Sequence, residues 1–169
     1  VYTKREVPLT PEQEKLYIQM KKLALAQLDN GELSTTASVL TQIMRLQQIC
    51  CGHITDDDGN IVPVASNRYK ELVDICDELQ GKAIIWATYT QDIQQIASTL
   101  RDRFGPEAVA TYYGDTAQDD RQDTVSKFQD KDSELRFFVG QPRTGGYGIT
   151  LTAANTVIYY SNSYDLEIR

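Results

Sequence analysis

The sequence predicts an α/β fold in which a parallel sheet, covered by helices on both faces, follows a helical N-terminal segment. Two patterns carry this prediction. The first third shows only helical periodicity, and the remainder alternates short apolar runs with amphipathic stretches. Composition agrees, because 169 residues with 41% hydrophobic and 24% charged residues are typical of a folded domain with its own core. No apolar run reaches the roughly 18 residues of a membrane span, so we expect no membrane contact.

The first third predicts two helices and a turn. Thr10-Pro11-Glu12-Gln13 has the form of a capping box with Thr10 as N-cap, and Asn30-Gly31 supplies the end of that helix. Apolar residues then recur at helical spacing over residues 39–50. A run rich in Asp, Gly and Asn follows, and it predicts a turn or hairpin near 54–64, since its spacing fails as a calcium loop.

The remainder predicts helices and strands in alternation. Helices are expected over residues 69–79, from an N-cap at Thr90 to residue 104, and from residues 116–119 onward. Strands are expected at residues 83–87, 108–112, 136–140 and 156–160. We therefore divide the chain into a helical segment, residues 1–67, and an α/β domain, residues 68–169.

Cysteine usage indicates the compartment. The odd set of Cys50, Cys51 and Cys76, without a secretion signal, predicts reduced thiols inside the cell. We expect the cytoplasm if the protein is bacterial or viral and the nucleus if it is eukaryotic. The single histidine, His53, follows two of them closely. A zinc site would need a fourth ligand and a different spacing, so we expect no metal site.

Charge limits the kind of nucleic-acid contact. Seventeen basic and twenty-four acidic residues give a net charge of −7, which excludes binding through a broad basic face. Contact with a phosphate backbone at a few points, beside a more basic partner domain, remains compatible with this charge.

Polar residues follow each predicted strand. These segments are Thr88-Tyr89-Thr90, Gly114-Asp115-Thr116, residues 141–148 and Ser161-Asn162-Ser163. Because ligands of parallel sheets bind beyond the carboxyl ends of the strands, these residues are the candidate site. Glycine backbone N–H groups, threonine hydroxyls and one arginine suit a phosphate. The alternative, that the glycines of 141–148 only form a tight loop, stays open.

Several catalytic motifs are absent from the sequence. There is no G-x-x-x-x-G-K-[ST] segment, no acidic pair closing an apolar strand, and no histidine near a nucleophile with a carboxylate to orient it. We therefore expect that the chain does not hydrolyse a nucleotide by itself and holds at most half of such a site.

Five segments match the motifs of one known family. They are 9–17 (LTPEQEKLY), 46–53 (LQQICCGH), 81–89 (GKAIIWATY), 113–116 (YGDT) with Arg121 and Phe128, and 143–154 (RTGGYGITLTAA). They are distributed along nearly the whole chain and resemble the C-terminal RecA-like lobe of the Swi/Snf-type ATP-dependent DNA translocases, in helicase superfamily two. The last segment, similar to the motif V form RAGGLGINLTAA, is the longest and most specific match.

The resemblance implies roles for particular residues. Contact with the DNA backbone is implied for Thr88, Tyr89, Gly114, Asp115, Thr116, Arg143, Thr144 and Gly145. A position facing the nucleotide is implied for Gly146, Gly148 and Thr150. The implied partners are the N-terminal RecA-like lobe of the same protein and double-stranded DNA. ATP and Mg²⁺ would bind in the intact parent protein and not to this chain alone, which is expected to be a monomer.

The chain also departs from the family pattern. Gln141-Pro142 stand where the family has Ser-Thr, Thr150 replaces an Asn, and residues 161–165 replace an acidic stretch. The chain ends at Arg169, before the expected motif VI (QAEDRxHRxGQ), whose arginines would complete ATP hydrolysis. We therefore expect no catalytic residue in this chain and no activity from it alone.

Two readings of function follow. The first is the second motor lobe of a DNA-dependent ATPase, and the alternative is a RecA-like binding or regulatory module without motor activity. A stand-alone metal or nucleotide enzyme lacks both ligands and a general base. Among single residues, Trp86 is expected to pack between sheet and helix, and Arg121 either fixes the neighbouring loop or faces the nucleic acid.

Overall fold

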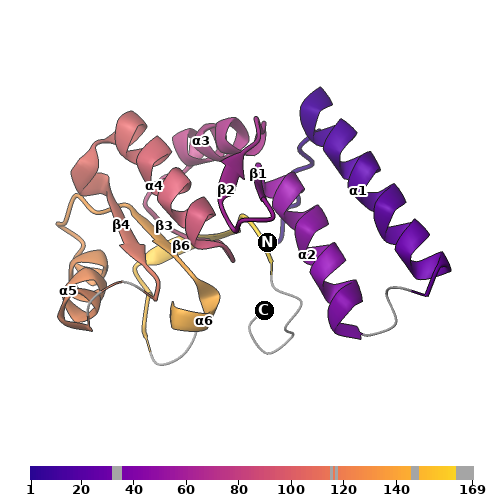
Figure 1. Ribbon diagram of the computed structural model, residues 1–169. Helices are drawn as coiled ribbons and strands as arrows, with labels where there is room; N and C mark the ends of the chain where they lie inside the picture. The colour runs from indigo at the N-terminus through magenta and orange to yellow at the C-terminus, as the bar shows by residue number, and fades with distance from the viewer. Residues whose placement is uncertain (32–35, 115, 117, 146–148, 163–169) are drawn as a thin grey trace. The chain divides into compact units, whose positions relative to one another are not determined.

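The helical first third and the alternating remainder form two units of structure, Val1–Glu71 and Leu72–Arg169 (Figure 1). The computed structural model describes residues 1–31, 36–114, 116, 118–145 and 149–162. Each unit is described in turn.

The first unit begins with α1, Pro11–Asp29, and its start is the predicted capping box. The Gln13 backbone N–H donates to Thr10 Oγ1 at 3.2 Å, and the Thr10 N–H donates to Gln13 Oε1 at 3.0 Å. Pro11 occupies the first helical position, where its missing N–H costs nothing. Asn30 is the C-cap, so both predicted ends of this helix are confirmed.

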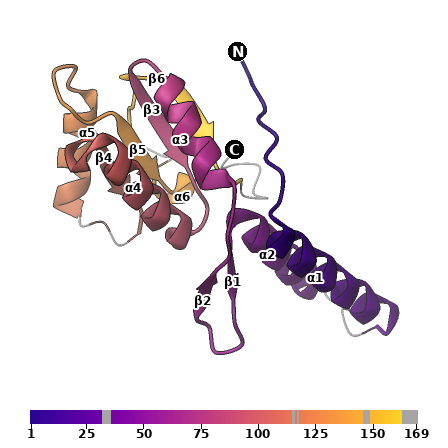
Figure 2. The same ribbon diagram turned by 90° about the horizontal axis from the view of Figure 1, so that it is seen from above.

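The second helix, α2, Thr36–Cys51, packs along α1 in the antiparallel direction (Figure 2). Gln13 joins the two helices, because its Nε2 donates to the Ile49 carbonyl at 2.8 Å while its side chain is buried. A polar side chain is stable in such a position only when its donors and acceptors are paired. The capping residue of α1 therefore also positions the end of α2.

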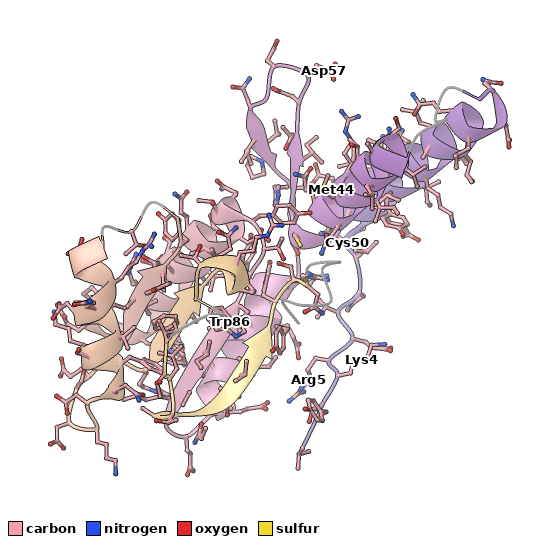
Figure 3. The ribbon with its side chains drawn as sticks, turned by 90° about the horizontal axis from the view of Figure 1, so that it is seen from below. Lys4, Arg5, Met44, Cys50, Asp57 and Trp86 are labelled. Carbon is pink, nitrogen blue, oxygen red and sulfur yellow. The ribbon has the colours of Figure 1, made fainter. Side chains whose placement is uncertain are left out.

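A hairpin follows the helices, as the sequence predicts. Strands β1, His53–Thr55, and β2, Ile61–Pro63, pair antiparallel, and Asp57 lies at the turn (Figure 3). Asp56 closes the turn, since its carboxylate accepts from the Asn60 backbone N–H at 2.7 Å and from Asn60 Nδ2 at 3.1 Å. These hydrogen bonds, the Asn60 side chain first, hold the pKa of Asp56 below its usual value.

The second unit contains a four-stranded parallel sheet, of which all strands lie among the described residues. Its strands are β3, Lys82–Trp86; β4, Val109–Tyr112; β5, Phe137–Gly140; and β6, Ala154–Tyr159. Their spatial order is β4-β5-β3-β6, so β3 and β5 are central and β4 and β6 form the edges. The predicted fold class, a RecA-like parallel sheet preceded by a helical segment, is confirmed.

Helices cover both faces of this sheet. They are α3, Arg68–Glu78; α4, Thr90–Phe104; a 3₁₀ turn at Pro106–Ala108; α5, Gln118–Gln129; and the single turn α6, Pro142–Gly145. Neighbouring strand residues point to opposite faces, and the ring contacts identify which helix lies on each. Phe137 meets Phe104 of α4 at 4.9 Å between ring centroids, whereas Phe138 meets Phe128 of α5 at 5.4 Å.

Trp86 lies in the core on the α5 face, as expected from the sequence (Figure 3). Its ring meets Phe138 edge-on at 6.1 Å, and Tyr112 packs on the other side of the same phenylalanine at 5.2 Å. Next to these aromatic rings, β5 ends at Gly140. A Cβ at Gly140 would come within 2.9 Å of Trp86 Cζ3 and 3.0 Å of the Tyr112 carbonyl.

Lys82, the first residue of β3, anchors the end of α5. Its Nζ donates to the Phe128 carbonyl at 2.9 Å and to the Asp130 carbonyl at 2.5 Å. A cation suits this position because the last carbonyls of a helix lack partners and carry partial negative charge. Burial lowers the pKa of Lys82, and the charge of Asp130 opposes that change.

One helix start differs from its prediction. Thr90 is the first residue of α4, and the N-cap is Tyr89, which makes no side-chain cap bond. Propensity favours threonine as a cap, but the end of β3 fixes where the chain turns into the helix, one residue earlier. Among the described residues, no helix is long and apolar enough to cross a bilayer.

Candidate functional site

The carboxyl ends of the four parallel strands bring the polar segments Thr88–Thr90, Tyr113–Gly114, Gln141 and Ser161 to one edge of the sheet. The strands end in register, since Trp86 of β3 pairs with Gly140 on one side and with Tyr159 on the other. The pairing continues past β6, where the Tyr160 N–H donates to the Trp86 carbonyl at 2.9 Å. Residues one or two positions beyond each strand therefore meet their neighbours.

Thr88 and Ser161 are joined by two hydrogen bonds. The backbone N–H of Thr88 donates to Ser161 Oγ at 2.9 Å, and Thr88 Oγ1 donates to the Ser161 carbonyl at 3.4 Å. Ser161 is buried, so its hydroxyl is an internal acceptor and not a surface group. The loop after β3 is thus fixed to the loop after β6.

Gln141, just past β5, joins the same loop from the other side. Its Nε2 donates to the Thr88 carbonyl at 2.9 Å, and its backbone N–H donates to the Tyr112 carbonyl at 3.0 Å. Its Oε1 accepts from Thr144 Oγ1 at 3.4 Å, and its carbonyl accepts from the Thr144 N–H at 3.0 Å. We call Ser161, Thr88, Gln141 and Thr144 the strand-end network. It runs across the ends of β6, β3 and β5 into α6.

The loop after β4 is held by Arg121 of α5. Its guanidinium donates to the Tyr113 carbonyl at 3.3 Å and to the Gly114 carbonyl at 3.0 Å, and lies over the Tyr112 ring at 5.7 Å. Thr116 Oγ1 accepts from the Tyr113 N–H at 3.1 Å. Of the two roles that the sequence left open for Arg121, these contacts establish that it fixes the loop.

The segment after β5 is partly helical. Pro142 begins the turn α6, which spans Pro142–Gly145 and carries the exposed Arg143. The sequence suggested a Gly-rich loop whose Pro142 removes a donor. At the first position of a helical turn, however, proline has its preferred φ and no N–H is needed.

The predicted site residues divide into four groups. The contacts above involve Thr88, Thr144, Thr116 and Gly114. Beside them lie Tyr89, the N-cap of α4, and Arg143 and Gly145 of α6. Thr150 is exposed beyond α6. Asp115, Gly146 and Gly148 lie outside the described residues. The sequence therefore predicted that most of these residues gather at one edge of the sheet but not the bonds along it, and the functional roles of these residues stay predictions.

One contributor to this edge was missed as a functional candidate. Gln141 was noted only as a departure from a family pattern. It lies just past a strand end, where a long amide can join two backbones. Gln129, at the end of α5, makes a similar link at the opposite edge of the sheet, where it donates to Thr152 Oγ1 at 3.0 Å and accepts from the Ala153 N–H at 2.8 Å, just before β6. Only the tertiary pairing reveals this.

The described part of the chain contains no cluster of metal-ligating side chains. No group of three or more His, Cys, Asp or Glu side chains there is arranged to hold a metal ion. The three cysteines are free thiols, and burial raises the pKa of Cys50 against the opposing charge of Arg68.

A parallel sheet with polar loops at its carboxyl edge, preceded in the chain by a helical segment, is typical of a RecA-like lobe. The family described as "Helicase conserved C-terminal domain" matches residues 67–168, more than half of the chain. The chain belongs to this family.

Comparison with solved structures identifies the type of helicase lobe that the chain resembles. The solved structure "Sulfolobus solfataricus SWI2/SNF2 ATPase C-terminal domain" superposes with a TM-score of 0.74 at 25% identity, covering 94% of this chain and 70% of that one. The "Sulfolobus solfataricus SWI2/SNF2 ATPase core in complex with dsDNA" gives 0.71 at 25% identity, with coverages of 91% and 33%. The resemblance to the C-terminal lobe of Swi/Snf-type proteins is therefore confirmed.

A curated relative agrees. The "SWI/SNF chromatin-remodeling complex subunit snf22" of Schizosaccharomyces pombe is 28% identical over 173 residues, which cover 94% of this chain. The chain matches two curated relatives along most of its own length but spans only 18% and 10% of theirs.

Proposed function

We propose that this chain is the second motor lobe of a DNA-dependent ATPase that translocates along double-stranded DNA. The observation that carries the proposal is the strand-end network. It fixes the loops after three strands together at the edge of the sheet where the family resemblance puts the DNA backbone contacts. Family membership and the DNA-bound core of a structural relative support it. The proposal is that ATP closes the two lobes of the parent and hydrolysis reopens them, so that each lobe contacts the DNA in alternation.

The start of α4, next to Thr88 and Tyr89, offers the first proposed contact. Thr88 positions this segment, because its N–H and its hydroxyl both donate to Ser161. The first N–H groups of a helix lack partners within it, and Tyr89 supplies no side-chain acceptor for them. A phosphate oxygen at this end would receive these N–H groups and gain from the helix dipole. Such a contact reads no base sequence, as a translocase requires.

The loop after β4 supplies a second proposed contact, through Gly114, Asp115 and Thr116. Arg121 engages the carbonyl oxygens of Tyr113 and Gly114, which keeps these partial negative charges away from an approaching phosphate. In its bond with the Tyr113 N–H, the Thr116 hydroxyl is the acceptor, so its own hydrogen is directed elsewhere.

The turn α6 supplies the third proposed contact, through Arg143, Thr144 and Gly145. Arg143 is exposed and always charged, and its planar guanidinium suits phosphate oxygens. Gly146, Gly148 and Thr150 follow and would face the nucleotide. We propose that ATP and Mg²⁺ bind between this lobe and the N-terminal lobe of the parent, which would supply the carboxylate for the metal.

ATP hydrolysis by the intact parent protein, with and without double-stranded DNA, tests the proposal. Wild type should hydrolyse ATP faster with DNA, and Arg143→Ala should lower that stimulation about tenfold by removing a charged phosphate contact. Arg103→Ala is the matched control, because Arg103 is an exposed arginine of α4 paired with Asp77. Hydrolysis that DNA does not stimulate, or none at all, would favour a regulatory module instead.

A further inference from the structure

The strand-end network depends on one side chain that bridges two of the proposed contact segments. Gln141 Nε2 lies 2.9 Å from the Thr88 carbonyl, after β3, and Gln141 Oε1 lies 3.4 Å from Thr144 Oγ1, on α6. A carbonyl can only accept, so the amide nitrogen must face Thr88, and the amide oxygen then faces a hydroxyl that can donate. The chemistry of both neighbours thus fixes the orientation of the amide.

The two bonds join segments that are otherwise far apart in the chain. Thr88 precedes α4, and Thr144 lies on α6, beyond β4, α5 and β5. Gln141 is half-buried, and its own backbone is held by the Tyr112 carbonyl at 3.0 Å, so the bridge rests on a fixed strand end. The side chain keeps both bonds only in this position, so a movement of one segment away from the other would break one of them.

We propose that Gln141 is a positioning residue that makes the loop after β3 and the turn α6 contact DNA as one rigid unit. The inference rests on the proposed function and deepens it. Gln141 itself need not touch DNA. Its amide sets the spacing between the Thr88 and Arg143 segments, so that both meet phosphates of one strand together, and a second contact costs less once the first is made.

The test measures ATP hydrolysis by variants of the intact parent protein. Two quantities are compared: the DNA concentration and the ATP concentration that each give half-maximal hydrolysis. Gln141→Met keeps the length of the side chain and removes both bonds. It should raise the half-saturating concentration of a duplex oligonucleotide about fivefold and change that of ATP less than twofold. Gln122→Met, the same substitution at an exposed position of α5, should match wild type.

Gln141→Glu is the second variant. It can still accept from Thr144 but cannot donate to the Thr88 carbonyl, and it adds a negative charge beside the DNA. It should raise the half-saturating DNA concentration more than Gln141→Met does, and added salt should remove the difference between the two. Because it retains one bond, it also serves if Gln141→Met unfolds early in a thermal melt.

The outcomes separate the two proposals. If both Gln141 variants match Gln122→Met while Arg143→Ala loses stimulation, the motor function stands and the positioning role is wrong. If Gln141→Met raises the DNA and ATP concentrations equally, the residue acts on the fold as a whole and the positioning role is again wrong. If DNA stimulates no hydrolysis even in wild type, both proposals fall.

Discussion

At the scale of single residues, Cys76 of α3 has the most strongly displaced acidity. Its thiol is fully buried, and burial raises its pKa to about 12, with Arg136 opposing and Asp77 adding to the change. At pH 8.5 about a quarter of an ordinary thiol is ionised, against roughly one Cys76 in 3,000. We expect iodoacetamide to alkylate the half-exposed Cys50 first and to leave Cys76 unmodified until urea unfolds the chain.

Peptide mass spectrometry after timed alkylation measures both sites in one sample. Equal rates at Cys50 and Cys76 in the native protein would contradict the burial of Cys76. The same pKa sets a pH dependence. The folded pKa lies above the ordinary value of 9.0, so the unfolded thiol ionises first. Its contribution to stability is complete below about pH 9 and is lost as the pH rises toward 12.

Residue-scale features could be predicted where they depend on nearby residues. The capping box of α1 needs only Thr10 and Gln13, three positions apart, so the sequence contains the whole motif. Gln141 is different, because its partner Thr88 is brought to it by the pairing of β3 with β5, and only its other partner, Thr144, is close in the chain. No local pattern distinguishes a bridging glutamine from a solvated one.

At the scale of elements, α5 is held at both ends. Arg121 binds the loop before it, and Lys82 of β3 binds the carbonyls of Phe128 and Asp130 at its end. Lys82→Met would leave these carbonyls without their charged partner. We expect the free energy of unfolding of the sheet-containing unit to fall by about 1–3 kcal/mol.

Urea unfolding followed by the fluorescence of Trp86, which reports on the same face of the sheet as α5, measures this loss. Lys131→Met is the matched control, because Lys131 is exposed in the loop just after α5. Unfolding midpoints that coincide for the two variants would show that Lys82 contributes nothing beyond its aliphatic chain.

The turn α6 shows which elements cannot be predicted from the sequence. Apolar residues located every strand of the sheet within about two residues. The central strands β3 and β5 are buried on both faces and therefore form continuous apolar runs, whereas the edge strand β6 is exposed at alternate residues. The turn α6 has no such signal. Four residues cannot show helical periodicity, and the glycines that follow favour a loop prediction. Pro142 was the one local clue, since proline favours the first position of a helix.

At the scale of the whole molecule, charge limits how the chain could contact DNA in the proposed function. Residues 72–169 contain nine basic and fifteen acidic residues, so the sheet-containing unit carries −6 of the total −7. Affinity from such a lobe must come from a few positioned contacts. We expect Arg143→Ala, in the intact parent, to reduce the slope of log K against log salt concentration by about 0.9, the value for one phosphate.

Fluorescence anisotropy of a labelled duplex, titrated at several salt concentrations, gives this slope. Arg103→Ala should leave the slope unchanged because its guanidinium pairs with Asp77. A wild-type slope that Arg143→Ala does not alter would show that Arg143 makes no ionic contact with the DNA backbone.

The fold class could be predicted at this scale, and the edge proposed for the site follows from that fold class. Alternating strands and helices imply a parallel sheet, and a parallel sheet places its ligands at one edge. The spatial order β4-β5-β3-β6 could not be read from the sequence, because several orders bury the same apolar runs equally well. That order nevertheless decides which loops become neighbours.

The same strand order has a consequence during synthesis. The central strand β3 is translated before both of its partners, and β5 and β6 follow only after α4, β4 and α5. Until Ala154–Tyr159 has left the ribosome, the apolar run of residues 83–86 therefore has an unpaired edge, the kind of surface that chaperones bind and that aggregates. A nascent chain stalled before β6 should be far more sensitive to protease than one stalled after it.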